Sequence, residues 1–205
     1  MGIGVLILGY SGSGKSTSMR NCTPDRFGVI NVQGKPLPFR TELKTYDTDE
    51  YGKVIGALRA GKTPSIVIDD SQYLMSHEFM NRASEKGYDK YGEIGQHFYM
   101  LLEAIRQMPD DRIVYLMHHI EINDTNGREN AKTVGKMVDN YIVVEGCFTI
   151  VLKAIVTTDG YFFRTKTNGA DPVKTPLGMF QEEQIDNDLL EVDNIIREFY
   201  GKEIQ

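Results

Sequence analysis

The sequence has little cysteine, no long apolar run and no excess of basic charge. Its 205 residues include two cysteines, Cys22 and Cys147, which lie far apart and in no metal-ligand spacing. We therefore expect neither a disulfide framework nor a zinc site, but reduced thiols inside a cell. The apolar stretch 3–8 is too short for a signal peptide, and no run approaches the roughly 20 apolar residues that span a bilayer. These absences predict a cytoplasmic protein that does not enter a membrane.

The charge balance is acidic, with a formal net charge of −6. This counts against a broadly basic surface that coats nucleic acid, but a local basic loop remains open because the position of charge decides steering. Hydrophobic residues make up 40% and charged residues 25% of the chain, as in ordinary globular proteins. The length suits one domain with a substantial core.

Apolar runs of strand length alternate with helical patterns over the first two-thirds of the chain. Strands are predicted at 2–8, 27–32, 65–68 and 112–117, and helices at 15–21, 50–60 and in two segments between residues 71 and 108. The segment 33–41 contains Pro36 and Pro38 and is predicted to be irregular. This alternation predicts an α/β fold with a mostly parallel sheet and helices on both faces.

The pattern changes at about residue 141. Short strands are predicted at 141–144, 148–156 and 161–166, with Asp159-Gly160 as a tight hairpin turn, and a helix at 186–200. We expect one domain over residues 1–205, made of a nucleotide-binding α/β core (1–140), C-terminal strands and a hairpin (141–180), and a C-terminal helix (181–205).

Residues 9–16 match the Walker A phosphate-loop pattern without a mismatch, with a strand before and a helix after. The glycines let backbone amides point inward around phosphates, and the helix adds the positive end of its dipole. Lys15 is predicted to reach the β- and γ-phosphates, and the Ser16 hydroxyl to bind Mg²⁺. The residues predicted to bind nucleotide are Gly9, Tyr10, Ser11, Gly12, Ser13, Gly14, Lys15, Ser16 and Thr17.

Two acids follow the apolar run 66–68 and resemble the end of a Walker B strand. Asp69 is predicted to hold Mg²⁺ through a coordinated water, and Asp70 to face the γ-phosphate and orient the attacking water. The alternative is that both acids only cap the helix that follows.

His118 and His119 end the next predicted strand. Ligands of open parallel sheets lie beyond the carboxyl ends of the strands, so one histidine is predicted to sense the γ-phosphate, and we favour His118. Two alternatives are a transition-metal site that includes Glu121 and a pair of loop-capping histidines.

The order of these features resembles the compact RecA-like ATPases common in bacteriophages, a group that includes single-strand annealing and recombination proteins. The resemblance spans residues 2–180 and is carried by the Walker motifs, the strand 113–119, and the segments DGYFFRTKTNG and TPLGMF. It implies a RecA-like core with a β-rich C-terminal hairpin region, ATP and Mg²⁺ as cofactors, and self-association with nucleotide at the interface.

The resemblance also implies two further sets of residues. The loop 120–137 corresponds in position to a single-stranded-DNA-binding loop, with Arg128, Lys132 and Lys136 balanced by Glu121, Asp124 and Glu129. A basic residue of the hairpin region would reach a neighbour's γ-phosphate as an arginine finger does. The candidates for that role are Arg164, Lys166 and Lys174.

One departure from the family concerns the catalytic base. RecA-like recombinases carry a glutamate just after the second strand, but here Asn31-Val32-Gln33-Gly34 follows and no acid comes before Glu42. Either Asp70 or Glu42 takes the role, or hydrolysis is weak. The leading hypothesis is thus a Mg-dependent ATPase of phage DNA recombination, which couples ATP to single-stranded DNA binding or annealing. The alternatives are a P-loop kinase of a nucleotide or small molecule and a non-hydrolysing, nucleotide-gated assembly factor.

Overall fold

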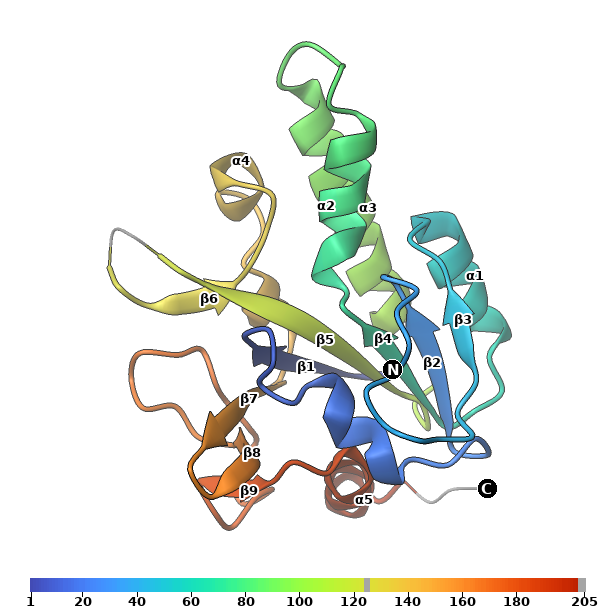
Figure 1. Cartoon of the computed structure of the whole chain (residues 1–205), viewed down its shortest axis with the longest axis vertical. Helices are drawn as coiled ribbons and strands as arrows, with labels where there is room; N and C mark the ends of the chain where they lie inside the picture. Colours follow the sequence, from blue (N-terminus) through green and yellow to red (C-terminus); the bar gives the residue numbers. More distant parts are fainter. Residues whose placement is uncertain (124–125, 203–205) are drawn as a thin grey trace.

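The strands form one nine-stranded sheet in the order β3-β2-β4-β5-β1-β7-β8-β9, with β6 paired to β5 alone. The computed structural model describes residues 1–123 and 126–202 (Figure 1). The six strands from β3 to β7 run parallel, and β6, β8 and β9 pair antiparallel with their neighbours. The strands are β1 Ile3–Gly9, β2 Phe27–Asn31, β3 Thr45–Asp47, β4 Ser65–Asp69, β5 Ile113–Ile122, β6 Glu129–Ala131, β7 Ile150–Thr157, β8 Gly160–Arg164 and β9 Gln184–Asp186.

Helices cover both faces of the sheet (Figure 1). On one face lie α1, α2 and α3, and on the other lie η1 and α5. No helix among residues 1–123 and 126–202 has the length and apolar character to cross a membrane. The helices are η1 Ser16–Asn21, α1 Tyr51–Ala60, α2 Gln72–Asn81, α3 Asp89–Arg106, α4 Lys136–Asp139, η2 Val144–Cys147 and α5 Leu189–Tyr200.

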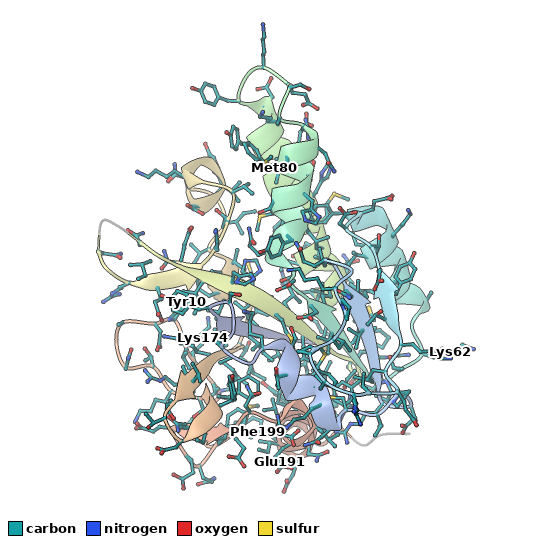
Figure 2. All side chains as sticks on the ribbon, in the orientation of Figure 1. Tyr10, Lys62, Met80, Lys174, Glu191 and Phe199 are labelled. Atoms are coloured by element: carbon teal, nitrogen blue, oxygen red, sulfur yellow. The ribbon has the colours of Figure 1, made fainter. Side chains whose placement is uncertain are left out.

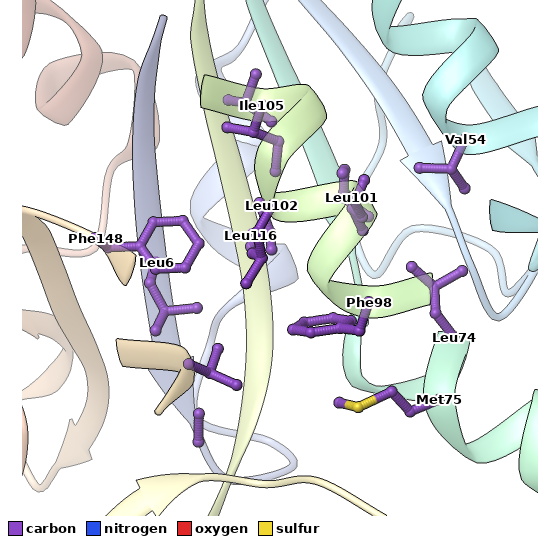
Figure 3. Close-up of a cluster of buried hydrophobic side chains, with 14 of the residues drawn as sticks. Leu6, Val54, Leu74, Met75, Phe98, Leu101, Leu102, Ile105, Leu116 and Phe148 are labelled. Atoms are coloured by element: carbon purple, nitrogen blue, oxygen red, sulfur yellow. The ribbon is translucent and has the colours of Figure 1, made fainter. Parts of the chain in front are cut away.

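The central strands are apolar on both sides because both sides are buried. In β1, Leu6 and Leu8 join the core under α1–α3, while Val5 and Ile7 join the core under η1 and α5. Figure 3 shows the first core, where Phe98, Leu101 and Ile105 of α3 lie against the sheet. This two-sided burial explains why the parallel strands appear as continuous apolar runs in the sequence.

The predicted α/β fold, with a mostly parallel sheet flanked by helices and a β-rich C-terminal region, is confirmed. One strand, β5, lies between the strand of the phosphate loop (β1) and the strand of the two acids (β4). All three strands are parallel, so their carboxyl ends meet at the same edge of the sheet. That edge is where an open α/β sheet binds its ligands.

Two predictions around β5 are wrong. The strand does not end before His118 but continues to Ile122, because β6 returns beside it as an antiparallel partner. The segment 120–137 is therefore not a plain loop: it contains the end of β5, then β6 and the start of α4, and it includes Asp124, which lies outside the described residues. We call β5, β6 and the turn between them the β5–β6 hairpin.

Five details of the remaining prediction also differ. Residues 141–144 do not form a strand, because the amides of Tyr141 and Ile142 both donate to the Val138 carbonyl in a turn that leads into η2. Residues 181–205 contain β9 before the helix begins at Leu189. The hairpin turn is Thr158-Asp159, since Gly160 already pairs with Thr157. The short helix after the phosphate loop is 3₁₀, and the strand β3 was not expected.

Candidate nucleotide site

The phosphate loop leaves the carboxyl end of β1 and turns through two glycines in the left-handed region. Gly12 has φ of +79° and Gly14 of +92°, conformations that a residue with a Cβ adopts only at a cost. At Gly9 a Cβ would lie 2.3 Å from the Ser13 hydroxyl, so the loop folds directly onto the end of its strand. Steric restriction of the loop therefore explains why glycine occupies positions 9, 12 and 14.

Lys15 folds back over this loop. Its Nζ donates to the carbonyls of Gly9 at 2.8 Å and Tyr10 at 3.0 Å, and the residue is 6% exposed. Burial lowers the pKa of Lys15 to about 8, against the charges of Asp70 and Asp69, which raise it. The ammonium thus lies at the centre of the loop, where phosphate oxygens would provide the missing negative charge.

Ser16 and Asp69 meet at the start of η1. The Ser16 hydroxyl donates to Asp69 Oδ1 at 2.9 Å, and Asp69 is 5% exposed. Burial, with the charge of Asp70, raises the pKa of Asp69 to about 6, although the hydrogen bond from Ser16 opposes this. A hydroxyl and a carboxylate are hard oxygen donors of the kind that Mg²⁺ takes, and Mg²⁺ keeps water in its other positions. This pair fits the predicted metal site.

Asp70 and His119 form a second pair, on the open side of the cavity. His119 Nε2 lies 3.2 Å from Asp70 Oδ1, and their side chains are 16% and 19% exposed. Burial raises the pKa of Asp70, but the hydrogen bond from His119 and the nearby positive charges outweigh it, so the pKa is lower than its ordinary value. Asp70 also has φ of +59°, unusual for a residue with a Cβ. The carboxylate is thus held ionised, at a strained backbone position.

His118, the favoured candidate for the sensor, does not line the cavity, because neighbouring side chains of a strand point to opposite faces. His118 is fully buried, lies beside Phe98, and makes ring-nitrogen hydrogen bonds with the Ser71 hydroxyl at 2.9 Å and the Lys132 carbonyl at 2.8 Å. Burial lowers its pKa to about 4. His119, not His118, lines the cavity. Within the described residues, no group of three or more His, Cys, Asp or Glu is placed to hold a metal ion, so the transition-metal alternative with Glu121 gains no support.

The cavity at this edge of the sheet has a volume of about 320 Å³. It brings together most of the phosphate loop with Asp70 and His119, while Glu42 is not among its lining residues. It also contains four residues that the sequence analysis missed: Lys35, Pro38 and Tyr161 come from segments far from the motifs, whereas Tyr73 follows Asp70 closely in the first turn of α2. The lining residues are Ser11, Gly12, Gly14, Lys15, Ser16, Thr17, Lys35, Pro38, Asp70, Tyr73, His119 and Tyr161.

Tyr10 connects the phosphate loop to the β5–β6 hairpin. Its hydroxyl donates to Glu129 Oε1 at 3.1 Å, and Glu129 also pairs with Lys153 of β7. The amide of Lys132 donates to the His119 carbonyl at 2.9 Å. The hairpin therefore contributes His119 to the site from its own first strand and is joined to the phosphate loop by the Tyr10 hydrogen bond (Tyr10 is labelled in Figure 2).

None of the three candidates for a trans-acting cation lines this cavity. Arg164 Nη1 lies 3.3 Å from Asp171 Oδ2, and Lys166 Nζ lies 2.7 Å from Glu183 Oε1. Lys174 is exposed, and its backbone bridges to Val151 of β7 (Figure 2). The candidates for DNA binding, Arg128, Lys132 and Lys136, are all exposed on or just after the β5–β6 hairpin.

The fold and the loop together define an α/β P-loop architecture. No protein-family model matches the chain, and no curated protein matches it. Among solved structures, the X-ray structure of the ATPase DotB of Legionella pneumophila is similar, with a TM-score of 0.36 and 12% sequence identity. The match covers 82% of this chain and 47% of DotB, so the chain spans about half the length of that structure.

Proposed function

We propose that this protein is a Mg²⁺-dependent ATPase. The observation that carries the proposal is the convergence on a single cavity of Lys15 and Ser16 from the loop after β1, Asp70 from just after β4 and His119 from β5, with Asp69 of β4 hydrogen-bonded to Ser16. Three separate segments supply a phosphate-binding cation, a pair of metal ligands and an ionised carboxylate. Phosphoryl transfer needs these parts, since its catalysis is mostly positioning and charge stabilisation.

Binding rests on the loop and its lysine. The inward-facing amides of the phosphate loop hold the phosphates, and Lys15 exchanges its contacts with the loop carbonyls for contacts with β- and γ-phosphate oxygens. Ser16 and Asp69 hold Mg²⁺, which when bound neutralises charge that develops on the phosphates.

Hydrolysis rests on Asp70 and His119. Asp70, ionised and steadied by His119, accepts a hydrogen bond from the attacking water and aligns its oxygen with the γ-phosphorus. The water oxygen forms the new bond, the bond from the γ-phosphorus to the bridging oxygen breaks, and the water proton leaves through Asp70 or a phosphate oxygen. Asp70 thus takes the role of the glutamate that is missing after β2. Glu42 suits this role less well because it does not line the cavity.

The test is phosphate release with three proteins. Wild-type protein is expected to release phosphate from MgATP, Lys15→Ala to lose ATP binding, and Asp70→Asn to keep binding but lose at least about a hundredfold in rate, within the usual range for general acid–base groups. If wild-type protein binds ATP but releases no phosphate, the non-hydrolysing assembly factor replaces this proposal. Transfer of the γ-phosphate to an added nucleoside monophosphate would instead establish the kinase.

We further propose that the β5–β6 hairpin binds single-stranded DNA when ATP is bound, as a member of a phage recombination system that self-associates. Two observations support the hairpin as the responding element: Tyr10 joins it to the phosphate loop, and His119 lies on its first strand. Its exposed cations, Arg128, Lys132 and Lys136, are the groups that would meet phosphates.

Filter retention of labelled single-stranded DNA, with MgATP and with MgADP, tests this second proposal. Replacement of these three cations by alanine should abolish ATP-dependent retention, whereas alanine at three exposed cations elsewhere, Arg59, Lys62 and Lys86, should not (Lys62 is labelled in Figure 2). Equal loss in both triple variants, or retention that ignores the nucleotide, contradicts it. Molar mass in solution with and without MgATP tests the self-association.

A further inference from the structure

The cavity around the phosphate loop has two chemically different ends. In the sheet, β5 and β4 lie on one side of β1, and β7 and β8 lie on the other. Asp70 and His119 therefore approach the loop from the first side, and Tyr161 of β8 from the second. Since the γ-phosphate belongs with Asp70 and His119, the nucleoside lies towards Tyr161.

Tyr161 presents an aromatic ring at this second end. The ring lies against Gly14: a Cβ built on that glycine would be 2.7 Å from Tyr161 Cδ1. The residue is 49% exposed and lines the cavity beside Thr17. A half-exposed ring next to a phosphate loop offers a face on which a nucleobase can stack.

Asn187 lies behind Tyr161 with an unsatisfied amide. Its backbone amide donates to the Tyr161 carbonyl at 3.3 Å, and its own carbonyl accepts from Arg20 of η1. Its side chain reaches the same glycine, with Oδ1 3.4 Å from the Cβ position on Gly14. The residue is 1% exposed, yet in the described part of the chain neither Oδ1 nor Nδ2 has a hydrogen-bond partner. A buried amide without partners is costly, so it calls for an explanation.

We propose that Tyr161 and Asn187 form the nucleobase subsite of the nucleotide cavity and that the base is adenine; this rests on the proposed function. The Tyr161 ring turns away from Gly14, and the base takes its place between ring and loop. The side-chain oxygen Oδ1 of Asn187 then accepts a hydrogen bond from the adenine amino group, while the side-chain Nδ2 donates one to adenine N7. Guanine presents two acceptors at this edge, which would leave Oδ1 unpaired.

Binding of ATP, ADP and inorganic tripolyphosphate, measured by calorimetry, tests the stacking. Tyr161→Ala should weaken ATP and ADP by at least about fivefold, from the usual worth of one base–aromatic stack, and leave tripolyphosphate within about twofold. The matched control is Tyr46→Ala, because Tyr46 is also 49% exposed but lies on the far strand β3 and outside the cavity. If Tyr161→Ala leaves ATP binding unchanged, or weakens tripolyphosphate as much as ATP, the stacking role of Tyr161 is overturned while the proposed function stands. If wild-type protein binds none of the three ligands, the proposed function fails together with this inference.

The preference between ATP and GTP tests Asn187. In Asn187→Ala the ratio of the two affinities should fall by at least about fivefold, the lower end for a bidentate amide–adenine contact. The midpoint of thermal unfolding without nucleotide should not fall, because the amide has no partner to lose. A lower midpoint with unchanged base preference would show that Asn187 is structural and overturn its role.

Discussion

Asp193 of α5 is the residue whose replacement should most disturb the fold without touching the nucleotide site. It is fully buried and ionisable, and four side chains donate to its carboxylate. Oδ2 accepts from Arg26 Nε and Arg197 Nε, each at 2.8 Å, and Oδ1 accepts from the Ser65 and Tyr115 hydroxyls at 2.5 and 2.7 Å. The carboxylate thus ties α5 to β4, β5 and the segment before β2.

Asp193→Ala leaves two guanidinium groups without their carboxylate, one of them, Arg197, itself 5% exposed. Breaking a buried ion pair by removing one partner costs about 3–5 kcal/mol. Arg197 also donates to the Asp111 carbonyl and to Ser65, and Arg26 is partly exposed, so each guanidinium keeps some solvation. We therefore expect about 3 kcal/mol, which for a chain of this size lowers the unfolding midpoint by about 6–12 °C.

Scanning calorimetry or circular dichroism on heating measures this shift. Asp110→Ala is the control, since Asp110 also pairs with a cation, Lys202 at 2.8 Å, but its side chain is 69% exposed. An exposed pair is worth less than about 1 kcal/mol, and its loss should move the midpoint by no more than about 4 °C. If the two variants have the same midpoint, the Asp193 network does not stabilise α5 as argued.

Two further predictions concern the site and the β5–β6 hairpin. Gly14→Ala should lose ATP binding and about 1–2 kcal/mol of stability, because Gly14 has φ of +92° and its Cβ position lies against Tyr161. The control Gly52→Ala, with open space around it in α1, should keep ATP binding and lose no stability, since alanine favours a helix over glycine by up to about 1 kcal/mol. ATP titration and thermal unfolding measure both effects. His118, with a pKa of about 4 when folded and about 6.5 when unfolded, contributes stability above pH 6.5 that is lost as pH falls towards 4. Between pH 7 and pH 5, measured by urea unfolding, the wild-type protein should lose about 2 kcal/mol more stability than His118→Asn, because other groups that titrate in this range, such as Asp69, are common to both proteins. Equal changes in the two proteins would contradict this.

The sequence predicts those parts of the site that are formed by short contiguous motifs. The phosphate loop and the Asp69-Asp70 pair are each a short run next to an apolar strand, so their placement at one sheet edge follows from the parallel topology. A choice between neighbouring residues is harder. His118 and His119 are neighbours on one strand, so their side chains point to opposite faces of the sheet. No local feature of the sequence indicates which of the two faces the cavity.

Residues that reach the cavity from distant segments were not predictable. Lys35 follows β2 and Tyr161 lies on β8, so their arrival depends on the order of strands in the sheet. At residues 141–144 the local sequence pattern itself is misleading. The β-branched residues of this segment are typical of a strand, but the amides of Tyr141 and Ile142 donate to the Val138 carbonyl in a turn and are not available to a strand partner.

In the proposed function, β5 would take part both in nucleotide binding and in the response of the hairpin, and its position in the sheet suits both roles. It lies between β1 and β4, so His119 at its carboxyl half faces the cavity that the other two strands build. Beyond His119 the same strand continues into the β5–β6 hairpin, whose Glu129 accepts from Tyr10 of the phosphate loop. If the hairpin responds to nucleotide as we propose, a change in charge beside His119 or a movement of Tyr10 would act on it through the backbone of one strand and one side-chain hydrogen bond. The proposal then needs no separate relay element between the nucleotide and the exposed cations of the hairpin.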